Sequence, residues 1–135
     1  MRILALDVGN KRVGVAISDP SQVLARSLKV IPRRFPEDDC DAVARLVEEY
    51  KAERVIVGYP RSLDGTAGKQ AEEVERYAED LAKTLDVPVI LWDERFSTVS
   101  AERLMREAGQ GGRKGRERVD AVAAAVILQD YLDSF

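Results

Sequence analysis

The sequence predicts an α/β fold built on a mixed five-stranded sheet flanked by helices. Three β-type runs follow one another near the start of the chain, at residues 2–8, 12–18 and 24–31. Further along, amphipathic helical patterns alternate with two short apolar runs, at 54–58 and 88–92, which are typical of buried parallel strands. We therefore expect the first three strands to form an antiparallel meander, and the strands at 2–8, 54–58 and 88–92 to run parallel to one another.

Turn and breaker residues mark the ends of the predicted strands. Gly9–Asn10 separates the first two strands and suits a turn with φ > 0. Pro32 ends the third strand, because proline cannot donate to a ladder of hydrogen bonds. Apolar residues at helical spacing predict helices over 40–50 and 71–85. A third helix is predicted to begin at Ser97 or Thr98, which can cap it, and an alanine-rich helix is predicted from about 117 to 132.

The composition excludes several classes of function. The 135 residues suit one domain, spanning 1–135, with a sizeable buried core. The chain has no histidine, which excludes histidine general bases, catalytic triads and histidine metal sites. Its single cysteine, Cys40, lies on an apolar helical stripe and excludes an internal disulfide and a cysteine zinc site. No signal-peptide layout or membrane-length apolar run is present, so we expect a cytoplasmic protein without membrane association.

The charge distribution is uneven along the chain. The net charge of −3 argues against a nucleic-acid binder held by bulk charge alone. Basic residues nevertheless gather at Lys11–Arg12, at Arg33–Arg34 and in the segment 113–118. Glycines between 109 and 115 predict a mobile loop around the last of these clusters. A local basic patch of this kind is compatible with phosphate binding.

Asp7 ends a strand that is otherwise apolar. Burying a carboxylate beside such a strand is costly unless the group is paired or binds a metal ion. One interpretation is structural, with Asp7 accepting hydrogen bonds from the amides of the following turn. The other is that the protein uses this carboxylate for chemistry.

Further acidic residues are predicted to lie at the same edge of the sheet. Ligand sites in open α/β sheets form outside the carboxyl ends of the parallel strands. Asp7, the segment Gly58–Tyr59–Pro60, and Asp93–Glu94 each end one of these strands. If the last strand alternates regularly, Asp93 and Glu94 point to opposite faces, so only one of the two reaches a shared site.

Asp120 is predicted to lie in the first turn of the last helix. It shares a helical face with Ala123, Ala124 and Ile127, which should pack against the sheet. A structural interpretation is an acidic residue stabilised by the helix dipole. The functional interpretation brings it together with the carboxylates at the sheet edge.

Inward-facing carboxylates repel one another unless a cation neutralises them. Mg²⁺ and Mn²⁺ prefer oxygen ligands and suit a set without histidine. A pair of such ions about 4 Å apart can activate water and stabilise the leaving oxygen in phosphodiester hydrolysis. Backbone N–H groups at a helix start near residues 97–99 offer a second means of holding phosphate.

The chain resembles the YqgF family of proposed Holliday-junction resolvases in the ribonuclease H-like superfamily. The resemblance spans essentially the whole length and rests on four ordered motifs. They are Asp7-Val8-Gly9 through Arg12-Val13-Gly14-Val15-Ala16 to Ser18-Asp19; Val57-Gly58-Tyr59-Pro60 with Gly65-Thr66; Asp93-Glu94-Arg95-Phe96-Ser97-Thr98; and Val119-Asp120-Ala121 with Ala123-Ala124 and Ile127-Leu128.

The resemblance implies a ribonuclease H-like fold and a divalent-metal nuclease that matures the 5′ end of pre-16S rRNA. It puts the acidic triad, and so the Mg²⁺ or Mn²⁺ ligands, on Asp7, Glu94 and Asp120. Resolvase relatives tend to have a second aspartate one turn further along the last helix, where this chain has Ala123. Candidate substrate contacts are Asn10, Lys11, Arg12, Arg61, Arg95, Ser97, Thr98, Lys114 and Arg118.

Other functions stay open at this level. The chain can instead be a resolvase of branched DNA, which usually requires two sites and hence a dimer. It can also be a non-catalytic module that binds nucleic acid or a ribosomal particle. A further alternative is an actin-like phosphotransferase, whose phosphate loop resembles Asp7-Val8-Gly9, although such enzymes generally close two domains around the nucleotide. The sequence does not fix the oligomeric state.

Overall fold

The computed structural model describes residues 1–9, 11–34, 36–59, 69–93 and 112–134. The elements in chain order are β1 (Arg2–Val8), β2 (Arg12–Ser18), β3 (Ala25–Pro32), α1 (Pro36–Tyr50), β4 (Ala52–Tyr59), α2 (Lys69–Thr84), β5 (Val89–Asp93) and α4 (Gly112–Asp133). The predicted helix beginning at Ser97 or Thr98 lies outside these residues. No helix of the described segments combines the length and apolar character needed to cross a membrane.

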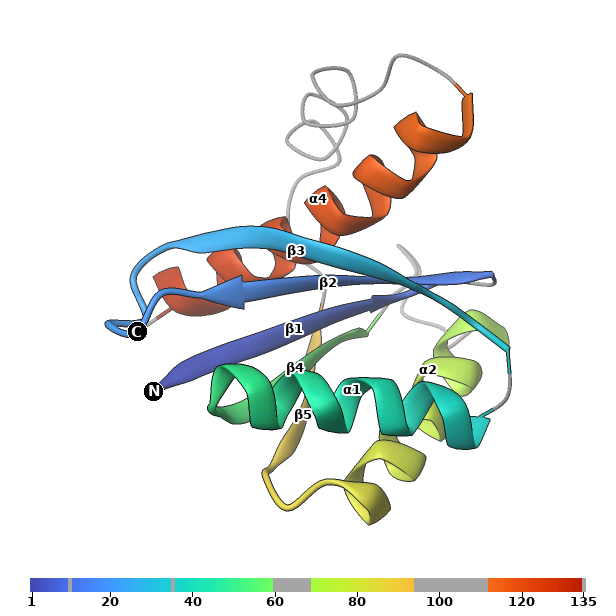
Figure 1. The fold of residues 1–135 in the computed structure, drawn as a ribbon, viewed down its shortest axis with the longest axis horizontal. Helices are drawn as coiled ribbons and strands as arrows, with labels where there is room; N and C mark the ends of the chain where they lie inside the picture. The colour runs from blue at the N-terminus through green and yellow to red at the C-terminus, as the bar shows by residue number, and fades with distance from the viewer. Residues whose placement is uncertain (10, 35, 60–68, 94–111, 135) are drawn as a thin grey trace.

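The five strands form one mixed sheet in the order β3-β2-β1-β4-β5. β1 is antiparallel to β2, and β2 is antiparallel to β3. β4 runs parallel to both β1 and β5, so the carboxyl ends of these three strands lie at one edge of the sheet (Figure 1). The predicted meander and the predicted parallel strands are therefore confirmed.

Helices cover both faces of this sheet (Figure 1). α1 and α2 pack on one face, where β1 contributes Leu4, Leu6 and Val8 to a large aliphatic cluster. α4 packs on the other face, over a smaller cluster that contains Ile3 and Ala5 of β1. Because side chains alternate along a strand, Asp7 belongs to the α4 face.

The C-terminal part of α4 is anchored by aromatic and polar contacts. Trp92 Nε1 donates to Asp130 Oδ2 at 3.0 Å, and the Trp92 and Tyr131 rings meet edge to face at 5.1 Å. Arg54 donates to the Tyr131 hydroxyl at 2.9 Å. The backbone N–H of Ala25 donates to Gln129 at 2.9 Å. These contacts fix the direction in which the helix crosses the sheet.

The start of α4 is one place where the sequence prediction was wrong. The helix begins at Gly112 rather than near residue 117, so the basic segment 113–118 is helical and not a loop. Arginine, lysine and glutamate are good helix formers, and their propensity outweighs the cost of Gly112 and Gly115. Cys40, in contrast, lies in the core as predicted, with 5% exposure, and burial raises the pKa of its thiol.

Candidate active site at the carboxyl edge of the sheet

Asp7 lies near the end of β1, half-buried, between two glycines. It pairs directly with Gly14 of β2. On its other side, the last paired row of β1 and β4 is Leu6 with Val57, so Asp7 lies level with Gly58. Both glycines are buried and belong to the same face as Asp7. The residues that lie level with Asp7 on the two neighbouring strands are therefore both glycines.

The turn after Asp7 brings two of the predicted phosphate contacts to the same edge. Gly9 N–H donates to the Arg12 carbonyl at 2.8 Å, which closes a two-residue loop. Lys11 is exposed in this loop, and Arg12 is half-buried at the start of β2. A Cβ on Gly9 would lie 2.8 Å from the Arg12 carbonyl oxygen, so close approach, rather than a left-handed φ, requires glycine here.

The register of β5 separates the two members of the acidic pair Asp93–Glu94. Tyr59 pairs with Asp93, and Gly58 pairs with Trp92. Ile90 and Trp92 pack with the α4 cluster, whereas Val89 packs with the α1–α2 cluster. By alternation, position 93 belongs to the face opposite Asp7. Position 94 begins a stretch outside the described residues.

Asp120 is the ninth residue of α4 and not part of its first turn. The structural interpretation based on the helix dipole is therefore wrong, since that effect is confined to the first turn. Position 120 precedes Ala124 by one turn, and Ala124 is fully buried against the sheet. By helical spacing, position 120 lies on the same side of α4 as Ala124.

The direction of α4 relates Asp120 to Asp7. Tyr131 bonds Arg54, which pairs with Ile3 near the start of β1. Asp120 precedes Tyr131 by about 16 Å of helix, and Asp7 follows Ile3 by about 13 Å of strand. The helix runs back along the sheet, so both positions lie toward the edge where β1 ends (Figure 1).

The remaining predicted site residues divide into two groups. The backbones of Lys114 and Arg118 lie in the first two turns of α4. The others lie outside the described residues, namely Asn10, Arg61, Glu94, Arg95, Ser97 and Thr98. Within the described segments, no three acidic or cysteine side chains gather to form a metal site.

Sequence reasoning missed the two glycines beside Asp7 as site residues. Gly14 appeared only within a family motif, and Gly58 appeared only within a family motif and as a residue near the end of a strand. The signal was available for Gly14, because a two-residue hairpin loop after Gly9 pairs residue 7 with residue 14. No comparable local rule predicts that β4 places Gly58 level with Asp7.

Comparison with known proteins agrees with this architecture. A family model described as "RuvX: Holliday junction resolvase" matches residues 1–134. A protein of Desulforamulus reducens is 46% identical over 134 residues, covering 99% of this chain and 98% of that protein. A protein of Bacillus cytotoxicus is 47% identical over 136 residues, covering 99% of each. Both relatives are named "Putative pre-16S rRNA nuclease".

Solved structures confirm the predicted ribonuclease H-like fold. Thermus thermophilus RuvC in complex with a Holliday junction substrate superposes with a TM-score of 0.64 at 15% identity, covering 99% of this chain and 94% of that one. The fowlpox virus Holliday junction resolvase gives a TM-score of 0.56 at 15% identity, with full coverage of both chains. At such low identity these neighbours establish the fold alone.

Proposed function

This chain belongs to the RuvX family, also called YqgF, and from that membership we propose that it is a metal-dependent nuclease that processes the 5′ end of pre-16S rRNA. Relatives 46% and 47% identical over nearly the whole chain carry the name of this activity. The observation that carries the proposal is Asp7, a half-buried carboxylate at the carboxyl edge of the sheet with a glycine on each flank.

The residues available at this edge fit a hard divalent cation. We propose Asp7, Glu94 and Asp120 as the ligands, because Mg²⁺ and Mn²⁺ prefer carboxylate oxygens and the chain has no histidine. The register of β5 supports Glu94 over Asp93, since position 93 belongs to the face opposite Asp7. The position of Asp120 one turn before the buried Ala124, toward the edge where β1 ends, supports its inclusion.

The described residues suggest how the protein prepares the substrate for hydrolysis. Asp7 is attached to a rigid central strand, so its carboxylate has a defined position relative to the sheet edge. Lys11 and Arg12 extend from the adjoining turn, where they can hold the phosphate groups that flank the scissile bond. A bound divalent cation would supply Lewis-acid activation of water and of the phosphoryl oxygen.

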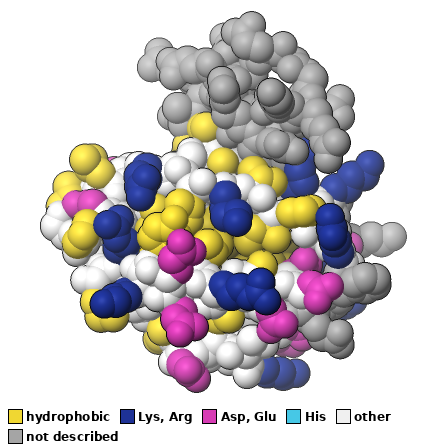
Figure 2. All heavy atoms as spheres, viewed as in Figure 1, with side chains coloured by type: hydrophobic (Ala, Val, Ile, Leu, Met, Phe, Trp, Pro, Cys, Tyr) yellow, Lys and Arg dark blue, Asp and Glu magenta, His cyan; other side chains and the backbone are white. Residues whose placement is uncertain are grey.

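The surface charge bears on how the substrate is selected. Lysine and arginine side chains intermix with aspartate and glutamate over the described face in Figure 2, and the net charge is −3. Bulk electrostatic attraction to RNA is therefore weak. We propose that contacts within a structured RNA or a pre-ribosomal particle supply the affinity, which implies action in the cytoplasm.

The test is cleavage of an RNA that carries the 5′ leader of pre-16S rRNA, with Mg²⁺ or Mn²⁺, by the wild type and Asp7→Asn. We expect metal-dependent cleavage by the wild type and a loss of at least about 100-fold in the variant, because loss of a ligand exceeds the loss of an outer-shell partner. Asp19→Asn is the matched control, since Asp19 follows β2 at the opposite edge of the sheet. Equal cleavage by Asp7→Asn and the wild type would refute the assignment of Asp7.

Resolution of DNA junctions is the second candidate function. The description of the matching family model and the shared fold with RuvC favour it. Ala123, at a position where resolvase relatives tend to have an aspartate, argues against it. A four-way DNA junction in the same assay separates the two: cleavage of the junction without cleavage of the RNA would make the protein a resolvase.

A further inference from the structure

The turn that follows Asp7 is held by a residue from a distant part of the chain. Arg33 lies immediately after β3, and its Nη1 donates to the Gly9 carbonyl at 2.8 Å. The backbone N–H of Arg33 donates to the Lys11 carbonyl at 2.9 Å. The same residue therefore contacts both ends of the two-residue loop, once through its guanidinium and once through its backbone.

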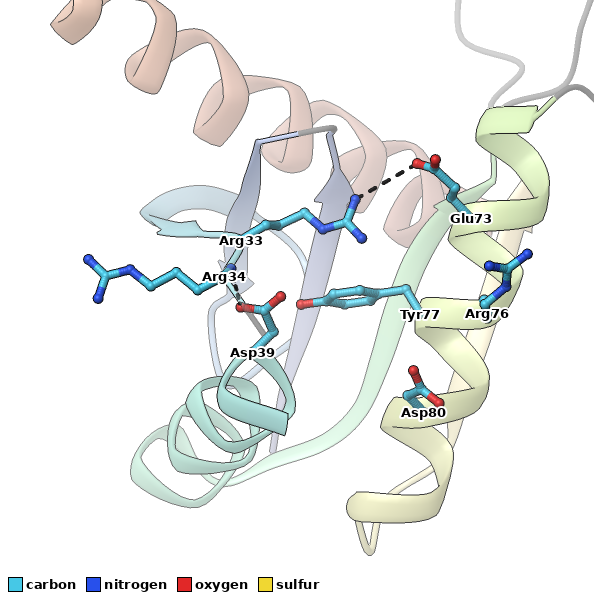
Figure 3. Close-up of a pocket in the computed structure, with 7 residues that line it drawn as sticks. All are labelled: Arg33, Arg34, Asp39, Glu73, Arg76, Tyr77 and Asp80. Atoms are coloured by element: carbon cyan, nitrogen blue, oxygen red, sulfur yellow. Dashed lines mark hydrogen bonds and ion pairs between the residues drawn. The ribbon is translucent and has the colours of Figure 1, made fainter. Parts of the chain in front are cut away.

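Two side chains of α2 approach the Arg33 guanidinium, with Glu73 above it and the Tyr77 ring below it in the view of Figure 3. The Arg33 Cζ lies 5.6 Å from the centre of the Tyr77 ring, within range of a cation–π contact. Its Nη1 lies 3.9 Å from Glu73 Oε2, and its side chain is 26% exposed. Tyr77 itself is only 6% exposed, so the surrounding core holds its ring in place against the guanidinium.

These contacts form a continuous connection from α2 to the candidate active site. Tyr77 and Glu73 orient the guanidinium, the guanidinium binds the Gly9 carbonyl, and Gly9 lies two residues after Asp7. A hydrogen bond from a charged donor is about twice as strong as one between neutral groups. Because the Arg33 side chain is half-buried, water screens this bond less than it would at the surface.

We propose that Arg33 is a positioning residue of the nuclease, which fixes the turn after Asp7 and through it the Asp7 carboxylate and the backbone beside Lys11. This inference depends on the proposed function only for its kinetic readout. Tyr77 and Glu73 line a cavity of about 540 Å³ together with Arg33, on the face covered by α1 and α2. Asp7 belongs to the other face, so Arg33 acts through the turn rather than by touching substrate.

The chain offers a matched control in the next residue. Arg34 lines the same cavity and carries the same charge, but its side chain is exposed, and its contact with Asp39 is made by the backbone N–H at 3.3 Å. Arg33→Ala and Arg34→Ala therefore remove equal charge from one place. Arg33→Lys keeps the charge and a donor nitrogen but loses the planar group that stacks on Tyr77.

The experiment measures steady-state RNA cleavage together with amide hydrogen exchange by NMR. We expect Arg33→Ala to lower kcat about 10-fold or more, as loss of an outer-shell partner does, with KM unchanged. Exchange of the amides at positions 9 and 33 should accelerate. Arg33→Lys should fall between Arg33→Ala and the wild type, Arg34→Ala should match the wild type, and added guanidinium should restore part of the activity of Arg33→Ala only.

Two results would overturn the proposal. Arg33→Ala that matches Arg34→Ala in both kcat and amide exchange would show that the contact does not hold the turn. A change confined to KM would show that Arg33 binds substrate directly. Absence of RNA cleavage by the wild type would refute the proposed function instead, and amide exchange at positions 9 and 33 would still decide whether Arg33 holds the turn.

Discussion

Two aspartates mark the ends of neighbouring strands, at opposite edges of the sheet, and their turns are closed in different ways. Asp19 follows β2, and its Oδ1 accepts hydrogen bonds from the N–H groups of Val23 at 2.8 Å and Leu24 at 3.0 Å. Its Oδ2 accepts from the Ser21 hydroxyl. This turn includes Gln22 with a φ of 60°, a conformation that side-chain-bearing residues rarely adopt. Here the carboxylate holds an unfavourable turn together.

The turn after Asp7 is held by backbone contacts and by a distant arginine. A backbone hydrogen bond from Gly9 to Arg12 closes it, and Arg33, 24 residues away from Gly9, clamps it from outside. Glycines flank Asp7 on both neighbouring strands. The comparison shows that a turn after a strand can be held by a side chain of the turn itself, as at Asp19, or by a residue from a distant part of the chain, as Arg33 does after β1.

Replacing Gly9 by alanine should disrupt the turn after Asp7 most strongly. The added Cβ would meet the Arg12 carbonyl oxygen at 2.8 Å, and this backbone atom cannot move aside cheaply. We expect Gly9→Ala to lower the free energy of unfolding by about 1–3 kcal/mol and to lower RNA cleavage as well. Urea denaturation measures the first effect. Lys11→Ala, an exposed change in the same turn, is the stability control, and equal stability of the two variants would refute the close approach.

A smaller change tests how Tyr77 supports that turn. The Tyr77 hydroxyl is buried and has no hydrogen-bond partner among the described residues, and burial raises the pKa of this group. Tyr77→Phe removes the unsatisfied hydroxyl but keeps the ring beneath Arg33. We expect the variant to gain about 1 kcal/mol of stability and to keep wild-type kcat. Loss of stability in thermal unfolding would show instead that the hydroxyl has a partner.

Most of the fold could be predicted from local patterns. Short apolar runs identified β4 and β5, and helical spacing from Cys40 to Tyr50 identified α1. The start of α4 was wrong because glycines near residue 112 were taken as loop signals, although the charged residues that follow favour a helix. Local propensities compete in such a segment, and packing of the distant Ala124 stripe contributes to the outcome.

Site residues could be predicted only where their place on a predicted strand indicated a function. Asp7 was identifiable because a carboxylate at the end of an apolar strand is costly unless it is used. Arg33 was noted only as half of a small basic cluster. The contact of Arg33 with Gly9 depends on how β3 pairs with β2. Its contact with the Tyr77 ring depends on how α2 packs against the β3–α1 connection. Tertiary contacts of this kind leave no periodic signal in the sequence.

The least costly test exploits the pH dependence of the Asp19 turn. Hydrogen bonds from Ser21, Leu24 and Val23 lower the pKa of Asp19 from 3.8 to about 2. A carboxyl group with a lowered folded-state pKa contributes stability above its unfolded pKa, and this contribution disappears as the pH falls toward 2. Wild type should therefore exceed Asp19→Asn in Tm at pH 5 and above, and the difference should shrink as the pH falls from about 4 to about 2.

The same pH series also distinguishes the Asp19 turn from the turn after Asp7. The contact that makes Gly9→Ala unfavourable is steric and involves no ionisable group. The difference in Tm between Gly9→Ala and Lys11→Ala should therefore stay constant between pH 2 and 5. A Tm deficit of Asp19→Asn that does not change over this range would contradict the role of the Asp19 charge. The expected result is a Tm deficit of Asp19→Asn that vanishes at low pH and a Tm deficit of Gly9→Ala that stays constant. It would show that the carboxylate stabilises the Asp19 turn, whereas close backbone contact constrains the turn at Gly9.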